Sequence, residues 1–283
     1  MVGASANYFA KPATGIKPVL WQLAFPLLVA YALIPLSFLI PSTNATRPPF
    51  FNLNSWFALC AYGITATGDL LGAALTGILM LVILATRAAT SWKHRLRETG
   101  IVLGWLVLMA GGGAALNEYV LKPALAFPRP NIVYLAGVDG SGPLKMPAQK
   151  FYALEKEIRR QHLRTVLETN PAPVVLHHKI REHWIATSGH SMPSGHAFTA
   201  MFFATFFLAL GLSWLSGSRL GFFYFLLPWA VAVCHSRVIL SVHNPIDIFA
   251  GGTIGIALGV LAFMLTRASV AALRRAAAAQ VEI

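Results

Sequence analysis

Three short segments, far apart in the chain, carry the ionisable side chains that lie closest to its long apolar runs. They are Lys122 with Arg129-Pro130, then Pro193-Ser194-Gly195-His196, then Ser236-Arg237 followed by His243 and Asp247. Charge held beside hydrocarbon is costly, and such residues usually have a function. Cations, two histidines and one carboxylate are the groups that phosphoryl transfer through a histidine nucleophile requires. We therefore expect the three segments to form one phosphoryl-transfer site.

His243 and Asp247 have the spacing of a nucleophile and its orienting carboxylate. Asn244-Pro245 is typical of an N-cap and first helical residue, which places Asp247 in the first turn of a helix. A carboxylate bound to one imidazole nitrogen leaves the other nitrogen free to attack. The alternative is that Asp247 only complements the positive end of the helix dipole.

The second segment is expected to open a membrane helix, with Pro193 at its start and Ser194-Gly195 exposing backbone N–H groups to a phosphate. His196 has no carboxylate at helical spacing, so we expect it to move protons without an orienting partner. A Ser/Gly turn with an incidental histidine is the structural alternative. The similar Ser188-Gly189-His190 shows that this motif alone is weak evidence, and we expect His190 to be dispensable.

The cations Lys122, Arg129 and Arg237 each stand at the end of a hydrophobic run or in a neighbouring loop. Each one taken alone fits an interfacial side chain that reaches up to the headgroups. Three of them beside two histidines fit better a cradle that neutralises a phosphoryl group. Glu118 is expected to pair with Lys122, and Asp69 to cap the second membrane helix, neither with a catalytic role.

The elements that must position these residues are membrane helices. The chain has 283 residues, of which 56% are hydrophobic and only 11% charged, whereas a soluble domain carries about 25% charged residues. Six apolar runs have the length needed to cross the hydrocarbon core. They are 18–40, 68–86, 100–121, 194–213, 219–238 and 245–266. We expect an all-α protein, a bundle of six transmembrane helices, with the first run retained as a helix and not cleaved as a signal.

The net charge of +12 is distributed as in a membrane protein, and not as in a nucleic-acid-binding protein. The cations gather in the short loops and ends on one side: Lys11, Lys17, Arg87, Lys93, Arg95, Arg97, Arg219, Arg267, Arg274 and Arg275. The positive-inside rule makes that side cytoplasmic. Both termini are then inside, and residues 41–67, 122–193 and 239–244 are outside, which brings the three segments to one face.

A long insert, residues 131–192, separates the third and fourth runs and is expected to be largely helical. One helix is predicted over 147–168, with Phe151, Leu154 and Ile158 on its apolar stripe, and a second piece around Leu176, Ile180 and Trp184. The insert is interpreted either as a basic cap over the outer face or as a small solvated domain. Its histidines lack the spacing of a zinc site. Cys60 and Cys234 are predicted to be small buried hydrophobes.

The three segments, with their internal spacings, resemble the signature of the type 2 phosphatidic acid phosphatase superfamily of membrane lipid phosphatases. The six-helix layout with a large insert is similar to the bacterial phosphatidylglycerophosphate phosphatase branch of that family. The resemblance implies hydrolysis of phosphatidylglycerophosphate, phosphatidic acid or undecaprenyl pyrophosphate. It also implies a multi-pass protein of the bacterial inner membrane whose site faces the periplasm.

The resemblance assigns a role to each signature residue. His243 takes the phosphoryl group, Asp247 orients it, and His196 protonates the leaving oxygen and then activates water. The phosphate is held by Lys122, Arg129, Ser194, Gly195 and Arg237. No metal and no cofactor are implied, because fixed cations and helix N-termini supply the positive charge.

Three other functions fit part of the same sequence pattern. A phosphotransferase would pass the phosphoryl group from histidine to an acceptor other than water, and its first half-reaction would be identical. A lipid transporter would need the cations but not the histidine pair. A vanadium haloperoxidase has a similar constellation, but the membrane spans argue against it. The expected partners are membrane lipids as substrates, with no nucleic acid and no obligate protein partner evident.

Overall fold

The computed structural model describes residues 15–87, 91–169 and 174–279, so Lys11 lies outside the described residues. Within these ranges every regular element is helical, which confirms the all-α prediction. Bundle elements preceding the insert are α1 (Ile16–Leu33), η1 (Ile34–Leu39), α2 (Trp56–Thr67), α3 (Leu70–Ala85), α4 (Trp92–Leu106), η2 (Val107–Gly111), α5 (Gly112–Leu116), η3 (Asn117–Leu121) and α6 (Lys122–Leu125). The others are α7 (Pro130–Ala136), η4 (Val138–Gly140), α8 (Ala148–Ala153), α9 (Lys156–Glu168), α10 (His178–Ala186), α11 (Gly195–Trp214), α12 (Ser218–Ile239) and α13 (Pro245–Ala279).

Five helical stretches are long and apolar enough to span a membrane, and the bent pair α2–α3 raises the number to six among the described residues. The five are Ile16–Leu39, Trp92–Ala136, Gly195–Trp214, Ser218–Ile239 and Pro245–Ala277. They include five of the six expected runs. The expected run 68–86 corresponds to α3, which by itself has only 16 residues.

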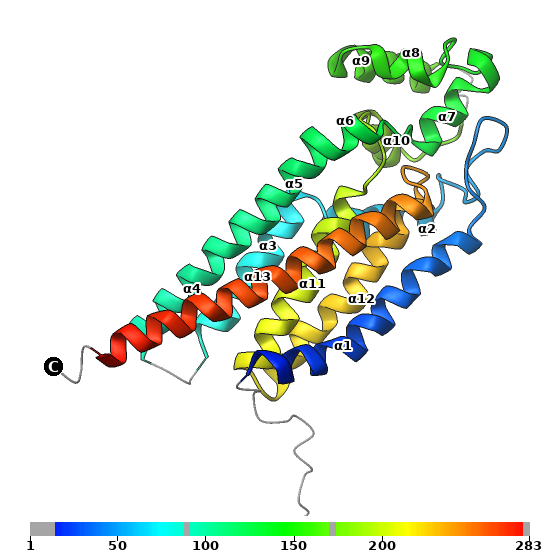
Figure 1. Ribbon diagram of the computed structural model, residues 1–283. Helices are drawn as coiled ribbons and strands as arrows, with labels where there is room; N and C mark the ends of the chain where they lie inside the picture. The colour runs from blue at the N-terminus through cyan, green and yellow to red at the C-terminus, as the bar shows by residue number, and fades with distance from the viewer. Residues whose placement is uncertain (1–14, 88–90, 170–173, 280–283) are drawn as a thin grey trace, which may run out of the picture.

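Helix α11 lies among the other long helices of the bundle (Figure 1). Its side chains are buried on nearly every face. Helix α13 approaches it closely because glycines recur at Gly251, Gly255 and Gly259. A Cβ at Gly255 would lie 2.3 Å from the Phe198 carbonyl oxygen, and one at Gly251 would lie 2.3 Å from that of Ser194. Small residues at this spacing let two membrane helices pack backbone to backbone. This contact holds the start of α13 against the start of α11.

The segment 41–67, expected to lie outside the membrane, contains the helix α2, which was not among the predicted helices. Ser55 caps this helix by accepting a hydrogen bond from the Ala58 N–H at 3.2 Å. After Thr67 the chain turns by 59° into α3. With only 12 residues, α2 is too short to cross a membrane by itself, so hydropathy did not separate it from a loop. Cys60 lies on α2 and is exposed, contrary to prediction, whereas Cys234 is buried.

The third and sixth membrane helices are longer than predicted. The third begins at Trp92, not at residue 100, and continues to Leu125 through two π-helical turns, η2 and η3. The sixth runs on to Ala279, past residue 266. Arg274 on this extension donates to Glu98 at 2.7 Å, and Glu98 also pairs with Arg87. These partners allow the charged ends of the two helices to stay helical.

The insert forms α7 to α10 and lies over one end of the bundle (Figure 1). Its apolar core is shared with α2 and with Leu240 and Val242 of the α12–α13 connection. The Trp184 indole N–H also donates to the Leu240 carbonyl at 2.9 Å. Of the two interpretations of the insert, the structure therefore favours a cap packed on the bundle.

The helix predicted over 147–168 is in fact two helices, because Leu154 and Glu155 are extended between α8 and α9. The apolar stripe was also wrong in part. Phe151 is buried, but Ile158 is 46% exposed, and α9 packs instead through Leu163 and its neighbours Val166 and Leu167. The break lets α8 and α9 turn different faces to the same core.

Candidate active site

His243 lies in the five-residue connection between α12 and α13 and is almost completely buried. The backbone N–H groups of Val242 and His243 both donate to the Arg237 carbonyl, at 3.2 Å, which folds the connection back on the end of α12. Ser241 takes a left-handed conformation, with φ of 57°, to make this turn. The turn places the imidazole beside Arg129 of the first segment.

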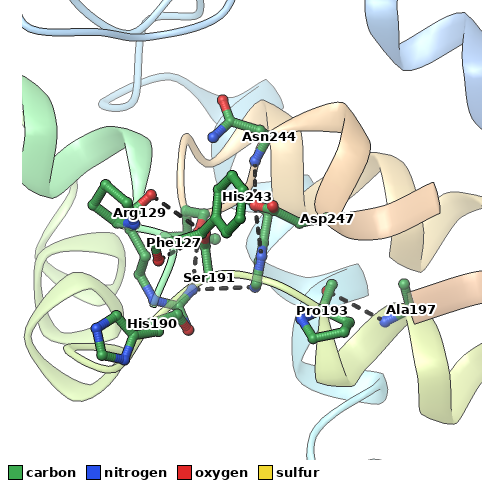
Figure 2. Close-up of polar contacts among 12 residues, drawn as sticks. Phe127, Arg129, His190, Ser191, Pro193, Ala197, His243, Asn244 and Asp247 are labelled. Atoms are coloured by element: carbon green, nitrogen blue, oxygen red, sulfur yellow. Dashed lines mark hydrogen bonds and ion pairs between the residues drawn. The ribbon is translucent and has the colours of Figure 1, made fainter. Parts of the chain in front are cut away.

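Asp247 holds both the His243 side chain and the backbone beside it (Figure 2). Its Oδ2 lies 3.3 Å from His243 Nδ1 and accepts from the Asn244 N–H at 2.8 Å. Pro245 is the first residue of α13, as expected. The expected contact between His243 and Asp247 is therefore present. It leaves Nε2 as the imidazole nitrogen that faces the cations.

Arg129 joins the first segment to the third and to the loop that contains Gly189 and His190 (Figure 2). Its Nη1 donates to the Val242 carbonyl at 2.9 Å and lies 3.1 Å from His243 Nε2. Its Nε and Nη2 donate to the carbonyls of Gly189 and His190, at 2.7 and 3.3 Å. A buried guanidinium in this arrangement puts a fixed positive charge directly beside the imidazole.

The charges around His243 favour its neutral form. Burial, and after it the charges of Arg129, Arg237 and Lys122, hold the pKa of His243 well below its ordinary value. A neutral imidazole keeps the lone pair that a nucleophile needs. Lys122 itself is buried at the start of α6, where its Nζ donates to Glu118 Oε2 at 2.6 Å, which confirms the expected pairing.

The segment Ser194–His196 opens α11 as predicted. Ser194 is the N-cap residue, and its hydroxyl accepts from the Ala197 N–H at 3.5 Å. Its own N–H donates to the Asp247 carbonyl at 2.9 Å, which ties the second segment to the third. The unpaired N–H groups of this first turn, at Gly195 and after, lie at the positive end of the helix.

The expectation that His196 has no carboxylate partner is wrong. Its Nε2 lies 2.6 Å from Oδ1 of Asp69, which stands at the break between α2 and α3. The partner is distant in sequence, so no spacing pattern could reveal it. Asp69 was also expected to cap the second membrane helix, but its side chain makes no capping hydrogen bond there.

Arg237 is completely buried on the last turn of α12 and has two partners that sequence reasoning missed. Its Nη1 lies 2.9 Å from His183 Nε2 and donates to Thr65 Oγ1 at 3.3 Å. Burial, and then the charge of Arg237, lower the pKa of His183 to about 2, so the imidazole is a neutral acceptor. His183 belongs to α10, so the insert contributes directly to the arrangement of the site. Nothing in the sequence distinguished His183 from the other histidines of the insert.

The segment Ser188-Gly189-His190 lies closer to the site than expected. Its backbone carbonyls accept from Arg129, as described, and the next residue, Ser191, donates its N–H to the Phe127 carbonyl at 2.9 Å. The His190 imidazole points elsewhere and stacks on the Tyr152 ring, with centroids 4.5 Å apart. The backbone of this segment supports Arg129, and the imidazole is not directed at His243.

A groove of about 480 Å³ leads along the bundle to His196. Its walls are the apolar faces of α3, of α4 through α5 and of α11, including Leu70, Leu106 and Phe203. Asp69, Glu118 and Asn117 lie at its polar end with His196. In the described part of the chain, no three His, Cys, Asp or Glu side chains are grouped closely enough to hold a metal ion. The groove can therefore hold an apolar chain whose end reaches His196.

Comparison with known proteins identifies the family of the chain. The model of the PAP2 superfamily matches residues 102–270, which include all three segments. Phosphatidylglycerophosphatase B from Escherichia coli K12 is 27% identical over 214 residues, which cover 75% of this chain and 78% of that protein. The proteins of the same name from Escherichia coli O157:H7 and Shigella flexneri match to the same extent. The expected resemblance is thus confirmed, and the chain belongs to the PAP2 superfamily as a membrane phosphatase.

Proposed function

We propose that this protein hydrolyses phosphate monoesters or pyrophosphates of membrane lipids through a phosphohistidine at His243. The observation that carries the proposal is the position of this imidazole. Nδ1 contacts Asp247, and Nε2 lies 3.1 Å from Nη1 of Arg129. This is the arrangement of a nitrogen nucleophile held by a carboxylate beside a cation that would attract its target.

In the first step, His243 Nε2 attacks phosphorus as the bond from phosphorus to the leaving oxygen breaks. His196 donates its proton to that oxygen, and the lipid alcohol or lipid phosphate departs. The phosphoryl oxygens are bound by Lys122, Arg129 and Arg237, with the Ser194 hydroxyl and the N–H groups from Gly195 onward. These groups are preorganised, so they offset the charge on the phosphoryl group without reorganising during the reaction.

In the second step, water attacks the phosphohistidine, the N–P bond breaks, and inorganic phosphate is released. His196, now neutral, accepts a proton from the attacking water, which restores both histidines. A phosphotransferase would differ only here, because another acceptor would replace water. Release of free phosphate without any added acceptor distinguishes hydrolysis.

Two observations support a lipid as substrate. The groove that reaches His196 is long, apolar and lined by bundle helices, as an acyl or prenyl chain requires. The similar proteins are named phosphatidylglycerophosphatase B. We therefore propose phosphatidylglycerophosphate, phosphatidic acid and undecaprenyl pyrophosphate as candidate substrates, with the phosphate at the polar end of the groove.

Purified protein assayed on these three lipids side by side tests the function. We expect phosphate release that persists in excess EDTA, because fixed cations bind the phosphoryl group. Vanadate should inhibit, since it can adopt the trigonal-bipyramidal geometry of the transferring group. No release from any of the three lipids would contradict the proposed lipid phosphatase. Loss of activity in EDTA that magnesium restores would contradict the metal-free mechanism.

We also propose the bacterial inner membrane as the location, with both termini cytoplasmic and the insert periplasmic. Its support is the clustering of Lys and Arg in the short loops opposite the insert. In a Cys60→Ala, Cys234→Ala background, Ser141→Cys in the insert should react with an impermeant thiol reagent in spheroplasts. Ser216→Cys, in the exposed loop between α11 and α12, should react only after lysis. The reverse pattern would contradict this orientation.

A further inference from the structure

The break between α2 and α3 places a carboxylate on the second histidine of the site. Asp69 Oδ1 lies 2.6 Å from His196 Nε2, although the two residues are 127 positions apart. The His196 side chain is 18% exposed and that of Asp69 is 48% exposed, so the contact lies at the polar end of the groove. Asp69 also precedes the segment matched by the family model, which begins at residue 102.

The backbone around Asp69 is held in place by contacts to α12. The Trp229 indole donates to Thr67 Oγ1 at 2.8 Å, and Thr65 Oγ1 lies 2.6 Å from Ser236 Oγ. Gly68 is necessary for the close approach, because a Cβ there would lie 2.8 Å from Val233 Cγ1 and 3.3 Å from His196 Cδ2. The position of Asp69 is therefore set by tertiary contacts and does not depend on its own side chain.

The Asp69 carboxylate does not cap the helix that it precedes. It stands at the N-cap position of α3, where Asp is among the preferred residues, yet it makes no capping hydrogen bond. Its only hydrogen bond in the described part of the chain is the one to His196. The half-exposed carboxylate therefore contacts the His196 imidazole, 2.6 Å away, and not the backbone N–H groups of α3.

We propose that Asp69 is a positioning residue for His196, a second carboxylate–histidine pair that complements Asp247 and His243. This inference rests on the proposed function and names what orients its proton carrier. The two pairs are reversed: His243 is held at Nδ1 and leaves Nε2 for phosphorus, whereas His196 is held at Nε2 and leaves Nδ1 for the leaving oxygen.

The chemistry explains why the proton carrier needs this partner. His196 stands among the cations of the site, which disfavour the imidazolium that must be present before it can act as an acid. A carboxylate on Nε2 stabilises that imidazolium and fixes the plane of the ring. During the first step the proton on Nδ1 passes to the leaving oxygen, the Nε2 proton stays between His196 and Asp69, and no other reactant is required.

The test compares two substrates that differ in how much their leaving group needs a proton. Rapid-quench labelling would follow phosphoenzyme formation from ³²P-labelled phosphatidic acid and from ³²P-labelled 4-nitrophenyl phosphate. Phosphatidic acid is the alkyl ester, and 4-nitrophenyl phosphate is the aryl ester. For Asp69→Asn we expect phosphoenzyme to form about 10–100-fold more slowly from the alkyl ester, which is part of the rate that general acid catalysis contributes. With the aryl ester the rate should stay within about 2-fold of wild type, because nitrophenolate leaves unprotonated.

A second comparison separates positioning from a merely structural role. In a His196→Ala background, Asp69→Asn should cause no further loss, since both changes remove the same function. Asp69→Glu, which keeps the charge, should recover part of the rate with the alkyl ester. Asp139→Asn, an exposed carboxylate in the insert, is the matched control and should behave as wild type.

Each outcome has one meaning. Equal slowing of both substrates by Asp69→Asn, or additive losses in the double variant, would overturn the positioning role. Wild-type rates on both substrates would overturn it as well. If Asp69→Asn does not fold, Asp69→Glu must show a selective loss with the alkyl ester, and an equal loss on both substrates refutes the proposal. Absence of any phosphoenzyme in the wild-type protein would instead refute the proposed phosphohistidine function.

Discussion

His243→Ala should abolish both turnover and the acid-labile phosphoenzyme, with a loss of about 10⁴-fold or more. The reason is geometric: His243 Nε2 is the nitrogen that lies among the cations, and no other imidazole takes its place. His196→Ala should also lose turnover on lipid substrates, but it should still form phosphoenzyme slowly from an aryl phosphate. The two variants should therefore differ in whether phosphoenzyme forms from the aryl phosphate. Rapid-quench labelling of both variants measures this difference.

His190→Ala is the control for this comparison. The imidazole of His190 stacks on Tyr152, whereas the atom that accepts from Arg129 is the backbone carbonyl, which alanine retains. We expect activity close to wild type, with a stability loss of about 1 kcal/mol from the lost stacking. Phosphoenzyme that survives in His243→Ala, or activity that collapses in His190→Ala, would show that the nucleophile is a different histidine.

Arg129→Lys should lower kcat/KM about 100-fold or more, although it preserves the charge. The guanidinium donates to the carbonyls of Gly189, His190 and Val242 and also lies beside His243. A lysine ammonium is a single point and cannot make all these contacts, so buried carbonyls would lose their donors. We expect a stability loss of about 2–4 kcal/mol, since two or three buried hydrogen bonds are removed.

Arg160→Lys is the control for the charge-preserving change. Arg160 lies on α9 and forms an ion pair with Glu157 at 3.4 Å. The Arg160 side chain is 37% exposed and that of Glu157 is 67% exposed. Such surface pairs contribute little, so neither activity nor thermal stability in detergent should change measurably. If Arg129→Lys matched the control in both measurements, the contacts of Arg129 with His243 and with the Gly189–His190 loop would not be needed for the site.

The features that were predicted correctly from the sequence depend on residues that are close together in the chain. A run such as 194–213 must be helical and buried in lipid or protein, because its length and apolar content permit nothing else in a membrane. The contact between His243 and Asp247 was predictable for the same kind of reason, since Asn244-Pro245 begins a helix whose first turn holds Asp247. The pairing of Lys122 with Glu118 follows equally from helical spacing.

The parts that were missed depend on contacts between distant residues. The 12-residue α2 is stabilised by packing against α12 and the insert, so its sequence alone resembled a loop. The split of α8 from α9 and the exposure of Ile158 depend on which faces the cap buries. Asp69 contacts His196, and His183 contacts Arg237, from segments that match no sequence motif, so neither contact was predicted.

The sequence by itself predicted the helical class, five of the candidate membrane spans and the three segments that the PAP2 family model includes. Local spacing and hydropathy are sufficient for these, since a helix carries neighbouring side chains to known positions. Only the tertiary structure decided which groups contact one another in the site. Arg129 binds backbone carbonyls of two loops, His183 contacts Arg237, and Asp69 contacts His196. Their positions arise from the bend at Gly68 and from the docking of the cap, where packing between distant helices, and not local propensity, selects the geometry.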